Sequence, residues 1–88
     1  MKQCGYKIYF WSNENNEPIH VHISKANPTG NATKIWLTKS GGTIVAHNNS
    51  EIPINELKKI LKVINDNYFF ILAKWEKYFE GQDVKFYC

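Results

Sequence analysis

The hydrophobic period of the chain changes once, near Pro53, and this change limits the folds that the sequence can adopt. Before it, short segments of alternating apolar and polar residues are separated by clusters rich in Asn, Gly, Pro and Ser; the segments are YKIYFWS, HVHIS, ATKIWLT and TIVAH. After it, apolar residues recur at steps of three and four. Alternation is typical of half-buried strands, and the longer step is typical of an amphipathic helix. The sequence therefore predicts strands first and a helix second.

The helical pattern predicts one long helix over residues 54–80, with Pro53 at its start. Its apolar stripe stays in phase throughout and comprises Leu57, Ile60, Leu61, Ile64, Tyr68, Ile71, Leu72, Trp75, Tyr78 and Phe79. Because Asn and Asp compete with the backbone for hydrogen bonds, the sequence NDN at 65–67 is where a kink or a break into two helices is expected. Phe69 and Phe70 fall outside the stripe, which indicates contact with the tail or a protein interface.

These elements predict an α+β fold, with an antiparallel sheet of about four strands and one long C-terminal helix packed on one face. We expect a single domain, with a strand region at 5–48, a helix at 54–80 and a tail at 81–88, because 88 residues support one modest core. The sequence KSGG at 39–42 is a hairpin signal between the third and fourth strands. The tail alternates apolar and polar residues, which favours an added edge strand.

Composition narrows the class of protein. The chain is 43% hydrophobic and 15% aromatic, which excludes a disordered chain, and it has no apolar run of membrane-spanning length. The formal net charge is +3, and all 11 basic residues are lysine. Without arginine the chain lacks the bidentate contacts that sequence-specific DNA readers favour. Contact with nucleic acid is therefore allowed by the charge but not required by it.

The chain is expected to be cytoplasmic. Its first residues, MKQCGYKIYF, contain no continuous apolar segment of the kind found in signal peptides. Cys4 and Cys88 lie at opposite ends of the chain and do not form the dense framework of a secreted disulfide protein, so free thiols are expected.

One face of the predicted sheet is expected to stay open to solvent, because a single helix covers only one face. Side chains alternate between the faces of a strand, so Ile19, Val21 and Ile23 are predicted to face the helix. By the same rule Val45 and His47 are expected to share a side. The open face is expected to gather aromatic, basic and histidine side chains, namely Lys7, Tyr9, Trp11, His20, His22, Lys34, Trp36 and, in one of two registers, His47. Such a face suits a planar or anionic partner, or burial in a homodimer.

The sequence HVH, with His20 and His22 two residues apart, supports three hypotheses. Both imidazoles reach one point in space, so they are candidate ligands for a divalent metal, with a third ligand from His47, Glu14, Glu17 or Cys4. Alternatively, they are a catalytic acid and base for phosphodiester cleavage, with a lysine stabilising the developing charge. The third hypothesis is structural, with both rings hydrogen-bonded on a polar sheet face. The candidate binding residues are Tyr9, Trp11, Asn13, Glu14, Lys34, Trp36 and His47.

Taken together, GYKIYFWSNENNEPIHVHI, ATKIWLT, AHNNS, ELKKI and KWEKYFEG resemble a bacterial family of small domains, domain of unknown function 4160, over 5–81. The positions on the shared pattern are Tyr9, Phe10, Ser12, Asn13, Glu14, Pro18, His20, Val21, His22, Trp36, Asn48, Glu56, Leu57, Trp75, Tyr78 and Phe79. The chain departs from the pattern in lacking arginines and in its tail.

The resemblance implies a protein partner, and with it nucleic acid as a further partner, because genes of this family look like members of toxin–antitoxin or regulatory pairs. It brings no established chemistry and no cofactor. The leading hypothesis is a small cytoplasmic interaction module that binds a protein or RNA through the open sheet face. The alternatives are a ribonuclease-like or metal-dependent phosphodiesterase that uses His20 and His22, and a homodimer built through the sheet face.

Overall fold

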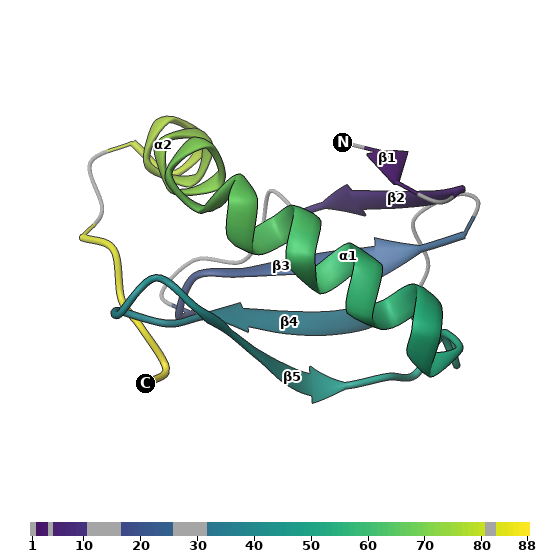
Figure 1. Ribbon diagram of the computed structural model, residues 1–88. Helices are drawn as coiled ribbons and strands as arrows, with labels where there is room; N and C mark the ends of the chain where they lie inside the picture. The colour runs from purple at the N-terminus through teal and green to yellow at the C-terminus, as the bar shows by residue number, and fades with distance from the viewer. Residues whose placement is uncertain (1, 4, 11–16, 26–31, 81–82) are drawn as a thin grey trace.

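The computed structural model describes residues 2–3, 5–10, 17–25, 32–80 and 83–88. Within them the chain forms an antiparallel sheet whose strands lie side by side in sequence order (Figure 1). The strands are β1 (Lys2–Gln3), β2 (Tyr6–Tyr9), β3 (His20–Ser24), β4 (Thr33–Leu37) and β5 (Thr43–His47). The four longer strands are those predicted from the alternating segments, and β1 adds two residues beside β2. The predicted α+β fold is confirmed.

Two helices follow the sheet, α1 (Ile54–Asp66) and α2 (Tyr68–Tyr78). The break falls at Asn67, inside the predicted NDN segment. The Asn67 side-chain amide donates to the Val63 carbonyl at 2.8 Å, while its own carbonyl accepts from Ile71 N–H at 2.9 Å and so begins α2. A side chain that donates a hydrogen bond to a backbone carbonyl in this way competes with the backbone hydrogen bonds of the helix. In Figure 1, α1 crosses one face of the sheet and α2 lies beyond the sheet end where β3 begins.

The hydrophobic core lies between the sheet and the two helices. The inward residues of β3 and β4 have essentially no exposed surface, as alternation predicts, and the apolar stripe of the helices supplies the other side. The members with the least exposure are Ile19, Val21, Ile23, Ile35, Leu37, Ile60 and Ile64. Two tyrosines tie the layers together by hydrogen bonds: Tyr6 Oη donates to Glu56 at 2.8 Å, and Tyr68 Oη donates to the Thr38 carbonyl at 2.5 Å.

A register shift in the last strand moves His47 to the opposite face from Val45. Ile35 pairs with Val45, whereas Lys34 pairs with His47, so one extra residue is accommodated in β5. A β-bulge of this kind reverses the alternation of side chains beyond it. The expectation that Val45 and His47 share a side is therefore wrong. The shift places His47 on the sheet face away from α1.

The loop between β5 and α1 is closed by the side chain of Asn48. Its Oδ1 accepts from Thr33 Oγ1 at 2.6 Å and from Ile52 N–H at 3.0 Å, and its Nδ2 donates to the Ile52 carbonyl at 2.9 Å. Thr33 Oγ1 also lies 2.5 Å from Ser50 Oγ, so this buried hydroxyl is well bonded. The network fixes the end of β5 against β4 and sets the position from which α1 begins.

The described part of the tail, 83–88, is not a strand, so the expected edge strand does not form. It contacts the sheet end at two separate points. Ile19 N–H donates to the Lys85 carbonyl at 2.8 Å, and Lys39 N–H donates to the Cys88 carbonyl at 2.9 Å. Among the described residues, no helix is long and apolar enough to cross a membrane.

Candidate anion-binding face

Four polar and aromatic side chains form a row across the face of the sheet that lies away from α1. Tyr9 of β2 pairs with His22 of β3, His22 pairs with Lys34 of β4, and Lys34 pairs with His47 of β5. Directly paired residues place their Cβ atoms about 5 Å apart. The cross-strand row, Tyr9–His22–Lys34–His47, therefore sets the lysine on the strand between those of the two histidines. Each of these residues was predicted to lie on this face or, for His47, to lie there in one of two registers.

Lys34 lies between the two histidines of the row, and its ammonium has two contacts outside the row. Its Nζ lies 4.3 Å from the centroid of the Trp36 ring and 3.7 Å from Glu17 Oε1. The lysine side chain is 17% exposed, while the Glu17 side chain is 47% exposed. A cation held over an aromatic ring, on a side chain that keeps some exposed surface, is placed to meet an anion at the surface.

His47 titrates below the ordinary range of histidine. Burial lowers its pKa from the usual value of 6.5, and the positive charges of Lys34 and His22 lower it further. Within the described residues, its buried Nδ1 has no hydrogen-bond partner. Both causes favour the uncharged imidazole, and a ligand that brings negative charge offsets the smaller one, the repulsion from Lys34 and His22.

His22 lies between two rings. The Tyr9 ring stacks on it at a centroid distance of 5.7 Å, and the His20 ring meets it edge to face at 5.0 Å. Because these contacts restrict the rotamers of His22, the imidazole is held on the row rather than left to sample the surface.

His20 does not lie on an exposed surface, contrary to the expectation for this face. It has no exposed area, and its ring meets those of Trp36 and Trp75 at 5.3 and 5.4 Å. The physical reason is that α2 lies at the end of the sheet where β3 begins, so Trp75 covers the ring. Because a carbonyl can only accept, His20 Nδ1 must donate to the Pro18 carbonyl at 2.7 Å, and Nε2 lies 3.6 Å from Glu17 Oε2. These contacts fit a positioning and packing role.

Trp36 is not an open stacking surface either. Tyr87 of the tail stacks on it with a centroid distance of 5.0 Å and an interplanar angle of 5°, and Lys34 lies over the same ring system. Tyr87 itself is 60% exposed, so the aromatic surface offered to a partner at this place belongs to the tail. The alternation of the tail sequence had indicated a strand and gave no sign of this contact.

Three of the candidate residues, Trp11, Asn13 and Glu14, lie outside the described residues. The same is true of Cys4, one of the alternative metal ligands. Among the residues that the structure does describe, no three His, Cys, Asp or Glu side chains come together as a metal site.

A search of curated proteins and a search of solved structures each find no match to this chain. A scan against protein-family models matches residues 5–76 to the family described as Domain of unknown function (DUF4160). The matched region contains β2 to β5, α1 and most of α2, and so it includes the whole cross-strand row. It ends before Tyr78 and Phe79, which the resemblance in sequence had included. Because the match spans most of the chain, the protein belongs to this family of domains of unknown function.

Proposed function

We propose that the chain is a small RNA-binding module in which a backbone phosphate lies at Lys34, between His22 and His47. The observation that carries the proposal is the cross-strand row, in which Lys34 is paired with a histidine on each of the two neighbouring strands. Lysine and histidine N–H groups donate to phosphate oxygens, and three donors from adjacent strands surround a tetrahedral anion from one side.

Single-stranded RNA is the form of nucleic acid that this face fits best. Proteins bind single strands by combining positive charge along the backbone with aromatic rings on which bases stack. Here Tyr9 lies at one end of the row, and Tyr87 covers Trp36 beside Lys34. The absence of arginine removes the side chain that most often reads guanine in the major groove of DNA.

The Glu17 carboxylate is the competing anion at this site. Its contact with Lys34 is 3.7 Å long and involves a half-exposed side chain, and exposed ion pairs of this kind contribute little to stability. A phosphate would replace this weak Lys34–Glu17 contact by hydrogen bonds from both Lys34 and an imidazole. The pairing with Glu17 is therefore compatible with exchange for a ligand.

A second candidate function, RNA cleavage, is supported by the lowered pKa of His47. A general base must be uncharged at the working pH, and His47 meets this condition. In this reaction His47 takes the proton of a ribose 2′-hydroxyl, whose oxygen attacks phosphorus. The bond from phosphorus to the 5′-oxygen breaks, and protonated His22 donates its proton to that oxygen. The products are a 2′,3′-cyclic phosphate and a 5′-hydroxyl, with Lys34 stabilising the added negative charge.

The proposal places this module in the cytoplasm, where an exposed thiol such as that of Cys88 stays reduced. A cognate protein of toxin–antitoxin or regulatory type is the competing partner for the same face. A second copy of the chain is the other competing partner. A cognate protein or a second copy would cover the cross-strand row without requiring the positive charge of Lys34. A substitution that removes only this charge therefore distinguishes these partners from RNA.

Replacing Lys34 by methionine is expected to weaken RNA binding about tenfold, because a hydrogen bond between charged groups is lost while the length of the side chain is kept. The measurement is fluorescence anisotropy of a labelled single-stranded RNA of about 12 nucleotides, titrated with protein at several salt concentrations. Loss of one phosphate contact also makes the slope of log affinity against log salt shallower by about 0.7.

Lys58→Met is the matched control, because Lys58 is exposed on α1 and its loss changes the net charge by the same amount. This control is expected to keep the wild-type affinity and slope. Equal effects of the two substitutions would show that any RNA binding is non-specific attraction to a basic protein. Gel analysis of the same mixtures tests the second candidate: shortened RNA ending in a cyclic phosphate supports cleavage, and intact RNA after prolonged incubation with tight binding excludes it.

A further inference from the structure

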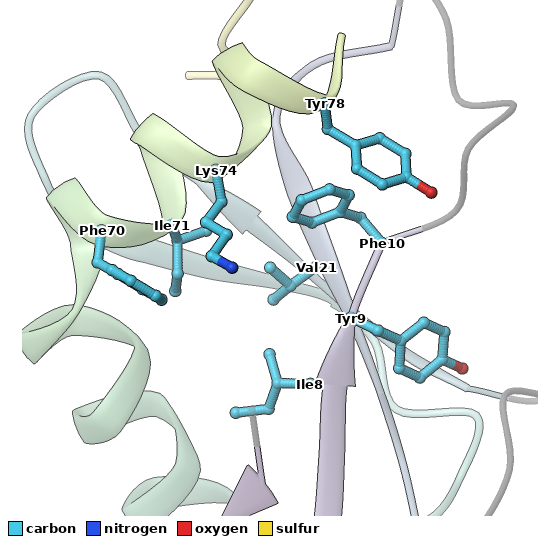
Figure 2. Close-up of a pocket in the computed structure, with 8 residues that line it drawn as sticks. All are labelled: Ile8, Tyr9, Phe10, Val21, Phe70, Ile71, Lys74 and Tyr78. Atoms are coloured by element: carbon cyan, nitrogen blue, oxygen red, sulfur yellow. The ribbon is translucent and has the colours of Figure 1, made fainter.

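The sheet face opposite the cross-strand row carries a cavity of about 530 Å³ (Figure 2). It opens between β2, β3 and α2, and its walls are mostly apolar. They are formed by Ile8, Phe10, Val21, Phe70, Ile71 and Tyr78, and Tyr9 also borders the cavity. Cavities of this size and composition are typical of sites for small organic molecules. The stripe on the helix predicts the burial of Ile71, but the cavity arises from the break at Asn67, which carries α2 past the end of the sheet.

One cation reaches this apolar cavity. Figure 2 shows the Lys74 side chain descending from α2 with its Nζ directed toward Val21, between the helix and the strands. The ammonium lies 5.4 Å from the centroid of the Phe70 ring. Within the described part of the chain, no carboxylate lies within the 4.0 Å that defines an ion pair with it. The cavity thus joins an unneutralised positive charge to an apolar wall.

We propose that this cavity binds a small aromatic monocarboxylate. The carboxylate meets the Lys74 ammonium, and the flat ring lies between Phe70 on the helix and Ile8 and Val21 on the strands. A monocarboxylate is the matching anion because one ammonium neutralises one charge, whereas a doubly charged phosphate would remain uncompensated in apolar surroundings. An aromatic body is favoured because it pairs with Phe70, which is 53% exposed without a ligand.

Tyr9 is the one described residue that both borders the cavity and belongs to the cross-strand row. This proposal is nevertheless separate from RNA binding, because the ligand is placed against Lys74, Phe70, Ile8 and Val21, and none of these belongs to the row. Ligand occupancy would bridge α2 to β2 and β3. It would therefore hold in place the helix that carries Trp75 over His20. Failure of either proposal leaves the other standing.

The test is a pair of matched probes, 1-naphthylacetate and its neutral amide, titrated into isotope-labelled wild-type protein and followed by NMR. We expect the acid to shift the methyl signals of Ile8, Val21 and Ile71, and to bind about tenfold more tightly than the amide, because only the acid forms a charge-assisted hydrogen bond. Equal affinity for acid and amide would overturn the proposal. So would shifts confined to residues outside the cavity.

Two pairs of variants locate the site. Lys74→Met is expected to reduce the affinity for the acid to that of the amide, whereas Lys77→Met, at a second exposed lysine of α2, is expected to leave it unchanged. Phe70→Ala is expected to lower the affinity for both probes. Phe69→Ala, at a ring that does not line the cavity, is expected to leave both affinities unchanged. Equal behaviour within either pair would place the binding elsewhere and contradict the proposal.

Discussion

Replacing Trp75 by alanine is expected to lower the free energy of unfolding by about 3–5 kcal/mol, the range measured when large aromatic residues are removed from protein cores. Trp75 is buried, and its ring meets Phe10, Phe79 and His20 at centroid distances of 5.4, 4.4 and 5.4 Å. It thus joins α2 to the end of β2 and the start of β3. The free energy of unfolding of a whole domain is about 5–15 kcal/mol, so the variant is expected to be marginally folded.

Urea denaturation followed by circular dichroism measures this effect. Phe69→Ala is the control, because Phe69 is the most exposed large apolar side chain described, at 78%, and its loss is expected to change stability by less than about 0.5 kcal/mol. Trp75→Phe keeps part of the packing and is expected to fall between the two, so the interpretation does not depend on the alanine variant folding. Equal stability of the Trp75 and Phe69 alanine variants would show that α2 does not pack on the sheet end as described.

Replacing His20 by alanine is expected to lower the free energy of unfolding by about 2–4 kcal/mol, because it leaves a cavity beneath Trp75 and removes a hydrogen bond to the Pro18 carbonyl. Were His20 only a surface residue of a polar face, the change would be close to neutral. Thermal or urea unfolding therefore distinguishes a buried positioning residue from an exposed catalytic residue.

His22→Ala is the matched control, since His22 is the other histidine of HVH and is only partly buried. The His22→Ala substitution is expected to lower the free energy of unfolding by about 1 kcal/mol or less. His20→Phe keeps a ring of similar shape but cannot donate to Pro18, so it is expected to recover part of the stability and to separate packing from hydrogen bonding. A His20→Ala protein as stable as wild type would contradict the burial of this ring.

The fold was predictable because its hydrophobic patterns are local. Alternation around Val21 and Ile35 fixed the inward faces of β3 and β4, and the NDN segment marked the place where Asn67 interrupts the helix. The position of α2 was not predictable, because the direction of a helix after a break depends on tertiary packing. That position is what buries His20 under Trp75.

The candidate site was predictable only in part, for similar reasons. Alternation placed Tyr9, His22 and Lys34 on one face, but whether they lie side by side depends on the register between strands. The face of His47 depends on a bulge that no local pattern marks. The cover that Tyr87 gives to Trp36 is a contact between distant parts of the chain, which alternation in the tail could not reveal.

The most direct test of a phosphate at Lys34 is the pKa of His47 with and without RNA, measured by NMR of the imidazole protons across a pH titration. In the free protein this pKa is expected below 6.5, because of burial and the charges of Lys34 and His22. A phosphate beside the ring favours the charged imidazolium, so bound RNA is expected to raise the pKa by about 1 unit or more. Binding then takes up a proton between the two pKa values, and affinity rises as pH falls through that window. A His47 pKa that is unchanged or lowered by saturating RNA would contradict the proposed site.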